Sequence, residues 1–288
     1  ARFSRSLFGS GASMGTLDIE VLRGLTDKEG ARLPEILAAH GVDIDNLDSA
    51  RTYMADVKAY VEVHIEQGPI LEQKGLGIAT VTGTKGIERE RLIFRGQAAH
   101  AGTMPMEMRR DSFRAAARFA LAIAEIGERH DGVTTVGHAQ CWPGVVTAVA
   151  GETRITMDMR HISAESLKAM YDEAHTAAAE AAEAEGCTIE WEHIFRIPPM
   201  PFHPKLLESA HRHVRDIEGH DFELPSGALH DASEVAREIP TVMIFSSSIA
   251  GLSHTKEEDT PDAHLEMAAE AFHRVCRDAI DLVAAGEL

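Results

Sequence analysis

The sequence predicts a protein of the α/β class in which one α/β domain is interrupted by a second domain. Segments with the two-residue period of strands alternate with helical segments through most of the chain. The stretch from about residue 87 follows the order β-α-β-β-α-β and closes at a stiff hinge, Pro198-Pro199-Met200-Pro201. We therefore expect an α/β domain made of residues 1–86 and 201–288, with an inserted domain at residues 87–200.

The first part of the chain predicts helices followed by two strands. Residues 17–40 have helical character, and Thr26-Asp-Lys-Glu29 has the pattern of a capping box. Residues 60–65 alternate between apolar and polar side chains and run into a Gly68-Pro69 turn, as a strand does where it ends. Residues 77–83 predict a second strand.

The inserted part has the most regular pattern of the chain. Its six expected elements are a strand at residues 89–95, a helix at 111–130, strands at 133–141 and 152–160, a helix at 164–185 and a strand at 187–195. This order is that of a ferredoxin-like unit. After the hinge, a helix from about Pro204, a buried strand at residues 240–245 and a helix from Pro261 return to the α/β pattern.

Composition excludes several classes of partner. The formal net charge of the 288 residues is −18, which argues against nucleic acid or an anionic membrane as partner. No apolar run approaches the roughly 20 residues of a membrane span. The three cysteines, Cys141, Cys187 and Cys276, form no CxxC pair and are typical of reduced packing residues in a cytoplasmic protein.

Four histidines lie in clusters flanked by glycine or serine. They are His64 before Gly68-Pro69, His100 before Gly102-Thr103, His230 after Ser226-Gly227, and His254 after Ser253. In α/β proteins, side chains at strand ends are where chemistry is placed. The four clusters therefore predict an active site that is assembled from distant segments, although each histidine taken alone also fits simple packing.

His64 and His254 are the candidate metal ligands, because both follow or end predicted strands of the α/β domain. Imidazole suits zinc, manganese, cobalt or nickel. A catalytic zinc needs three protein ligands and a water, and no carboxylate-rich strand end in the sequence completes this set. Metal ligation and ordinary packing therefore both remain open for these two histidines.

For the other candidates in the α/β domain, the sequence fits both a ligand-binding role and a purely structural role. Glu66 and Gln67 have side chains that orient a ligand, or they supply only turn polarity. Ser226-Gly227 offers a hydroxyl and backbone N–H groups for a carboxylate, or it is an ordinary loop. His230-Asp231 is a candidate pair whose side chains need not touch.

Two candidates lie in the inserted domain. His100 follows a predicted strand and precedes Gly102-Thr103. Asp158 and Arg160 lie two residues apart on one strand face, where Arg160 is able to hold a substrate carboxylate with two parallel hydrogen bonds. An internal Asp158–Arg160 ion pair is the alternative.

These clusters resemble the hydantoinase/carbamoylase family of dinuclear-metal amidohydrolases and peptidases. The matching strings occur in the order of that family and span nearly the whole chain. They are His64-Ile-Glu-Gln-Gly-Pro, Gly96-Gln-Ala-Ala-His-Ala-Gly-Thr-Met-Pro-Met, Arg109-Arg-Asp111, Asp158-Met-Arg160, Ser226-Gly-Ala-Leu-His-Asp-Ala and Ser253-His254.

The resemblance implies a metallopeptidase-type α/β catalytic domain with an inserted ferredoxin-like (βαββαβ) lid and dimerisation domain. It implies that His64 and His254 are metal ligands. His100 would polarise the substrate carbonyl, and Arg160 would hold the substrate, in part across a dimer interface. Gln67 and the Ser226-Gly227 turn would contact the substrate.

The resemblance also implies a reaction. Two divalent ions (Zn, Mn, Co or Ni) would activate a water for attack on the ureido carbon of an N-carbamoyl-L-amino acid, giving the amino acid, carbon dioxide and ammonia. Allantoate or β-ureidopropionate hydrolysis is the alternative. The implied partners are a small substrate with ureido and carboxylate groups and a second copy of the chain. The metal and the preferred ureido compound stay open.

The chain departs from the family pattern at two places. Thr147 stands where the family usually has asparagine; threonine is shorter and lacks the amide donor, which leaves the substrate contact there open. Ala1-Arg2-Phe3 resembles a string that in the family directly follows two glutamates, a general base and a metal ligand. The expectation is a member without its N-terminal segment that holds metal poorly and does not turn over, or else a non-catalytic dimeric remnant.

Overall fold

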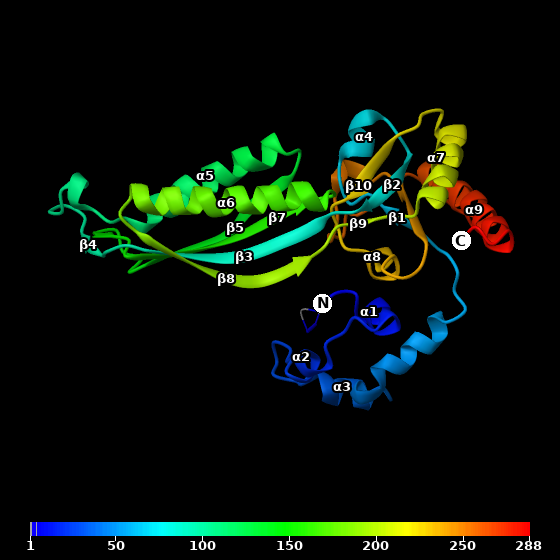
Figure 1. Cartoon of the computed structure of the whole chain (residues 1–288), viewed down its shortest axis with the longest axis horizontal. Helices are drawn as coiled ribbons and strands as arrows, with labels where there is room; N and C mark the ends of the chain where they lie inside the picture. The colour runs from blue at the N-terminus through cyan, green and yellow to red at the C-terminus, as the bar shows by residue number, and fades with distance from the viewer. Residues whose placement is uncertain (1, 4) are drawn as a thin grey trace. The chain divides into compact units, whose positions relative to one another are not determined.

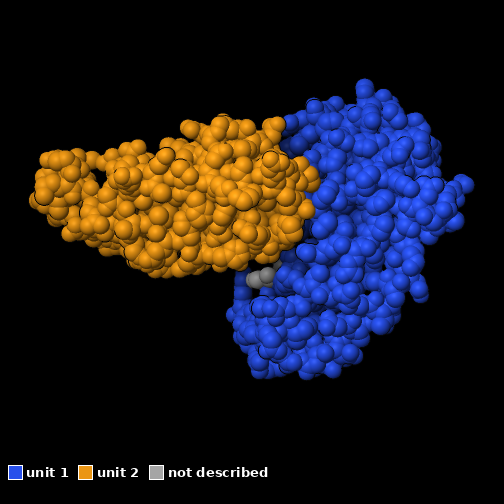
Figure 2. Space-filling view, in the orientation of Figure 1, with its two compact units in different colours: residues 1–84, 200–288 blue, residues 85–199 orange. Residues whose placement is uncertain are grey.

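The computed structural model describes residues 2–3 and 5–288, so Ala1 of the Ala1-Arg2-Phe3 string lies outside the described residues. The chain forms two compact units (Figure 2). Unit 1 consists of Ala1–Thr84 and Met200–Leu288, and unit 2 consists of Lys85–Pro199. Each unit has its own apolar core, so each is described by itself.

Unit 1 is built on a mixed sheet with the order β1-β11-β2-β10. Its strands are β1 (Tyr60–Ile65), β2 (Ile78–Thr84), β9 (Met200–Pro201), β10 (Glu223–Ser226) and β11 (Thr241–Ser246). β1 runs parallel to β11, which is antiparallel to β2, and the short β9 pairs with β2. Every residue of the inner strand β11 is buried, which explains its nearly continuous apolar sequence.

Helices cover both faces of this sheet (Figure 1). They are α4 (Ile70–Lys74), α7 (Pro204–Glu218), α8 (Asp231–Val235) and α9 (Asp262–Ala284). Along β11 successive side chains point to opposite faces. Val242 and Ile244 therefore pack with α7 and α9, whereas Met243 and Phe245 pack with Leu71 of α4 and Ala232 of α8.

Residues 8–54 of unit 1 form a small helical layer. Its elements are α1 (Phe8–Met14), α2 (Ile19–Arg23), α3 (Leu33–Ala39) and the 3-10 segment η1 (Ile44–Met54), which share an apolar cluster. The predicted capping box at Thr26–Glu29 is wrong. Asp27 instead accepts hydrogen bonds from the backbone of Glu29 and Ala31, so the segment is a turn and α3 begins at Leu33.

Unit 2 is an antiparallel four-stranded sheet with the order β5-β7-β3-β8. Its long elements are β3 (Gly86–Arg95), α5 (Ser112–Arg129), β5 (Val133–Trp142), β7 (Glu152–His161), α6 (Ala164–Ala184) and β8 (Thr188–Ile197). Their sequence is β-α-β-β-α-β, in agreement with the periodicity. The segments between them add the β4–β6 ribbon (Ala99–His100 with Ala148–Val149) and the short turn η2 (Met106–Met108).

The helices α5 and α6 pack together on one face of the unit 2 sheet. Leu92, Phe94 and Met157 point to this face and meet Phe119 of α5 and Met170 of α6. The opposite face has no helix among these elements and carries alternating charged side chains. Arg89 lies directly opposite Asp158 there, and Ile87 lies opposite Arg160.

Two structural findings concern the cysteines and the membrane spans considered in the sequence. Cys141, Cys187 and Cys276 are all free thiols. Within residues 2–3 and 5–288, no helix combines the length and the apolar character needed to cross a membrane.

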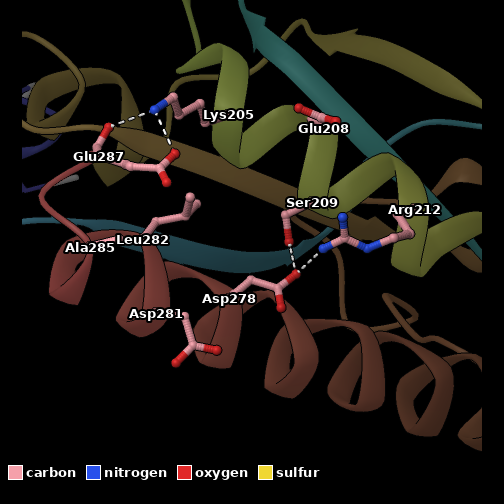
Figure 3. Close-up of a pocket in the computed structure, with 9 residues that line it drawn as sticks. All are labelled: Lys205, Glu208, Ser209, Arg212, Asp278, Asp281, Leu282, Ala285 and Glu287. Atoms are coloured by element: carbon pink, nitrogen blue, oxygen red, sulfur yellow. Dashed lines mark hydrogen bonds and ion pairs between the residues drawn. The ribbon is translucent and has the colours of Figure 1, made fainter.

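Asp278 joins α9 to α7 beside a hollow of about 430 Å³ (Figure 3). Its carboxylate accepts hydrogen bonds from Ser209, Arg212 and His213. Burial raises the pKa of Asp278, but these three donors outweigh it and hold the pKa below its usual value. The charged form therefore stabilises the fold at pH values above the pKa of the unfolded chain.

We expect Asp278→Asn to lower the free energy of unfolding at pH 7 by about 1 kcal/mol, because three charge-assisted contacts lose their charge. The difference from the wild type should shrink as pH falls through the folded-state pKa, where Asp278 itself becomes protonated. Urea unfolding at pH 7 and in acid measures this. Asp281→Asn is the matched control, because Asp281 is exposed on the same helix. An equal effect of the two substitutions would contradict the prediction.

Candidate metal and substrate site

His64 ends β1 in a conformation that leaves one ring nitrogen available. Its Nδ1 lies 2.8 Å from the carbonyl oxygen of Ile65. A carbonyl only accepts, so Nδ1 carries the proton and Nε2 keeps its lone pair. A backbone carbonyl that orients the ring in this way is the usual second partner of a histidine metal ligand. The donor chemistry of His64 therefore suits a divalent transition metal.

His230 packs edge-on against His64, with 4.5 Å between the ring centroids. It is 3% exposed, and its Nε2 lies 2.7 Å from the Ser226 hydroxyl. Burial, with a smaller contribution from the charge of His64, lowers the pKa of His230 to about 3. His230 is thus a neutral packed histidine. The possible His230–Asp231 pair is not formed, because Asp231 accepts instead from the Ser10 hydroxyl.

In the Ser226-Gly227 turn, one residue is buried and the other is exposed. Ser226 is 1% exposed, and its hydroxyl is occupied by His230 and by the backbone N–H of Ala228. Gly227, by contrast, is exposed. The Ser226 hydroxyl of this turn is therefore not available to a ligand in this conformation.

Glu62 is a partly buried carboxylate to which the sequence reasoning gave no role. It accepts hydrogen bonds from the Tyr60 hydroxyl at 3.1 Å and the Ala232 backbone at 2.8 Å, and it lies 3.6 Å from Nδ1 of His230. Burial raises its pKa above the ordinary value for glutamate. The strand period already placed Glu62 on the same face as His64, which was the available signal.

Gln67 joins the end of β1 to the loop that carries His254. This loop follows the 3-10 turn η3 (Ile249–Gly251). The Gln67 backbone donates to the Ser248 hydroxyl at 3.0 Å, and its side-chain amide donates to the Ser253 hydroxyl at 2.8 Å. Gln67 has φ 57° and His254 has φ 60°, so both adopt the sparsely populated left-handed conformation. Such conformations persist only where the surroundings hold them, here through these hydrogen bonds.

Glu258 is the second carboxylate that the sequence reasoning missed. It accepts the backbone N–H of His254 at 2.9 Å. This hydrogen bond, followed by one from Ser253 and by the charges of His254 and His64, lowers the pKa of Glu258. The charges of both His254 and His64 therefore act on the carboxylate of Glu258, and the His254 side chain is exposed.

The side chain of Glu66 forms hydrogen bonds with the backbone of the turn that follows it. Its two carboxylate oxygens accept the backbone N–H groups of Ile70 and Leu71 at 2.9 and 2.8 Å, and the residue is 8% exposed. It thus caps the first turn of α4, where a negative charge is favoured. Of the two readings left open for Glu66, the structure shows the turn-forming one.

The described donors of unit 1 do not complete a metal centre by themselves. In the described part of the chain, no group of three or more His, Cys, Asp or Glu side chains is arranged to hold a metal ion. A catalytic site needs about three protein ligands. His64 and His254 would therefore supply only part of such a ligand set.

His100 and Thr147 come together at one end of unit 2. His100 pairs with Ala148 in the β4–β6 ribbon, and the backbone N–H of Ala101 donates to the Thr147 carbonyl at 2.8 Å. Both side chains are exposed. The His100 Nδ1 accepts the backbone N–H of Gly102 at 3.0 Å, so Nε2 carries the ring proton and is a hydrogen-bond donor.

Arg160 lies at the other end of the same sheet. Its Nε and one terminal nitrogen donate to the two oxygens of Asp158 at 2.7 and 3.2 Å, and Arg89 also donates to Asp158. Burial raises the pKa of Asp158, but the two arginines outweigh it and the pKa is lowered. The internal ion pair that the sequence left open is therefore formed.

His100 and Arg160 are far apart within one unit 2. Arg160 lies opposite Ile87, and the β4–β6 ribbon lies beyond Arg95 at the other end of β3 (Figure 1). Arg95 lies eight positions after Ile87 along β3, which at roughly 3.3 Å per residue is about 25 Å. These two side chains of a single unit 2 do not reach one small substrate.

Comparison with known proteins places the chain in a family. A model of peptidase family M20/M25/M40 matches residues 21–278. The chain belongs to this family. The assignment implies divalent metal ions in general, and it agrees with the resemblance and the amidohydrolase role inferred from the motifs.

The curated relatives of this M20-family chain are amidohydrolases. It is 33% identical to the N-carbamoyl-L-amino-acid amidohydrolase of Paenarthrobacter aurescens, over 96% of this chain and 68% of that protein. It is 34% identical to the N-carbamoyl-L-amino acid amidohydrolase of Geobacillus stearothermophilus, over 95% and 67%. It is 30% identical to the allantoate amidohydrolase of Escherichia coli, over 90% and 63%. The chain thus spans about two thirds of these relatives.

Solved structures agree with this placement. A hydantoinase/carbamoylase family amidase from Burkholderia multivorans aligns with a TM-score of 0.84 at 30% identity, covering 97% of this chain and 67% of that one. A hydantoinase/carbamoylase family amidase from Burkholderia ambifaria aligns with a TM-score of 0.82 at 32% identity, with the same coverage. The α/β fold expected from the sequence is confirmed.

Proposed function

We propose that the protein hydrolyses the ureido C–N bond of N-carbamoyl-L-amino acids, releasing the amino acid, carbon dioxide and ammonia. The observation that carries this proposal is the arrangement at the end of β1. His64 there keeps Nε2 available, and Gln67 binds the loop of His254 through Ser253. The two relatives that are 33% and 34% identical bear the name of this activity and support it.

The proposed roles follow from the chemistry of each side chain. His64 and His254 would supply part of the ligand set for two divalent ions such as Zn, Mn, Co or Ni. His100 would donate its Nε2 proton to the substrate carbonyl oxygen, where charge develops during attack. Arg160 would hold the substrate carboxylate. Gln67, Thr147 and the Ser226-Gly227 turn would contact the rest of the substrate.

A second copy of the chain is part of the proposal. His100 and Arg160 are separated by about 25 Å of sheet in one unit 2, so one substrate meets both only if they come from different copies. A homodimer formed through unit 2 as a lid would supply this arrangement.

Allantoate hydrolysis is the second candidate, because the Escherichia coli relative named for it is 30% identical. A non-catalytic remnant is the third, because the described residues lack a three-donor cluster. We also place the protein in the cytoplasm, since its cysteines are free thiols.

Ammonia release from the full product of the gene tests these alternatives. It would be measured in the presence of manganese or zinc with N-carbamoyl-L-amino acids, their D forms, allantoate and N-carbamoyl-β-alanine. Preference for the L-carbamoyl compounds is the expected result. Preference for allantoate would move the assignment to the second candidate, and inactivity together with absence of bound metal would favour the remnant.

A further inference from the structure

Lys85 is a cation on the same corner of unit 2 as Arg160. It is the residue before β3, and Ile87, two residues later, lies directly opposite Arg160. Residues two apart in an extended chain point to the same face, which makes Lys85 and Arg160 diagonal neighbours. Such neighbours have Cβ atoms about 7 Å apart, within reach of two long side chains.

Lys85 has no counterion of its own in residues 2–3 and 5–288. It makes no ion pair there, although its side chain is half-buried. The nearest carboxylate on the sheet face, Asp158, is already shared by Arg89 and Arg160. Asp131 acts on Lys85 only through its charge, from an exposed turn.

This arrangement disfavours the charged ammonium. Burial and then the positive charge of Arg160 lower the pKa of Lys85, and Asp131 offsets them only in part. A half-buried charge without a partner costs free energy, and such groups gather where a ligand is to be bound. An anion placed between Lys85 and Arg160 would remove this cost.

We propose that Lys85 acts together with Arg160 to bind the substrate carboxylate, and that Lys85 makes this corner of unit 2 selective for anionic over neutral substrates. The inference rests on the proposed function, which requires a carboxylate-bearing substrate. Lys85 lies beside Arg160, whereas the carboxylate of Asp158 on this face accepts hydrogen bonds from Arg89 and Arg160. Lys85 contributes as a point charge rather than through a fixed hydrogen-bond geometry.

Two substitutions of Lys85 separate the effect of its positive charge from the effect of its length. Lys85→Gln removes the charge and keeps a polar side chain of similar length, whereas Lys85→Arg keeps the charge. Lys168→Gln is the matched control, because Lys168 is exposed on α6 and its ammonium pairs with Asp172 four residues away. A near-wild-type result for Lys85→Arg shows that the effect of Lys85→Gln is not a folding defect.

Calorimetric titration with N-carbamoyl-L-alanine and with its uncharged carboxamide, on the full gene product, tests the proposal without turnover. We expect Lys85→Gln to weaken binding of the carboxylate about tenfold and to leave binding of the carboxamide unchanged. We expect Lys85→Arg and Lys168→Gln to stay within about twofold of the wild type. The salt dependence of carboxylate binding should also become shallower in Lys85→Gln.

Three results would overturn the proposal. They are carboxylate binding that is unchanged in Lys85→Gln, equal weakening for both compounds, and a wild-type protein that does not bind the carboxylate. If instead the proposed function failed, binding and turnover would give a different pair of results. Binding would then still depend on Lys85, while ammonia release from every ureido compound would be absent.

Discussion

Replacing His64 by glutamine in the full gene product is expected to lower ureido hydrolysis by about 10³-fold and to reduce the bound metal. The structure orients the His64 ring through the backbone carbonyl of Ile65, which leaves its Nε2 available for a metal. Its loss removes a metal ligand whose contribution to transition-state stabilisation is several kcal/mol, and each 1.4 kcal/mol is about tenfold in rate. Metal analysis and steady-state ammonia release measure the two effects together.

His220→Gln is the control for this substitution, because His220 lies in an exposed turn after α7. It should retain wild-type activity and metal content. If His64→Gln kept its metal and lost no more than about threefold in rate, His64 would be a packed histidine and the metal assignment would fail.

Mixing the variants His100→Ala and Arg160→Ala is expected to restore activity that neither variant has alone. If each site takes Arg160 from one copy and His100 from the other, a mixed dimer has one intact site and one site without either residue. Random exchange of subunits in a two-fold dimer then restores about one quarter of the wild-type activity. The measurement is ammonia release after the two proteins have exchanged subunits.

The double variant His100→Ala/Arg160→Ala is the decisive control. When it is mixed with wild-type protein, every mixed dimer is inactive if the sites are shared between copies, so activity falls to about one quarter. If both residues of a site came from the same copy, each mixed dimer would keep one working site and about half would remain. Sedimentation as a monomer at micromolar concentration would also contradict the dimer.

Much of the fold was predictable because its signals are local. The pattern of residues 111–130 predicted α5, and the structure adds that the Asp111 side chain accepts hydrogen bonds as its N-cap. The uninterrupted apolar run before Ser246 predicted β11. The short elements α4, α8 and β10 were not predicted, because four or five residues are too few to establish a period. The capping box failed because a side-chain turn at Asp27 competes for the same backbone groups.

The same difference between local and long-range information applies to the candidate site. The sequence by itself predicted that His64 lies at the end of a strand, that His64 and Glu62 share a face, and that the motifs belong to an amidohydrolase family. His254, which was expected to follow a strand directly, instead lies in a loop beyond η3. Only the tertiary structure decided the pairings: His230 on His64, Asp158 on Arg160, and His100 and Arg160 at opposite ends of the unit 2 sheet. The physical reason is that periodicity depends on near neighbours in the chain. Hydrogen bonds and ion pairs, in contrast, depend on which strands lie side by side and which donors compete for each carboxylate.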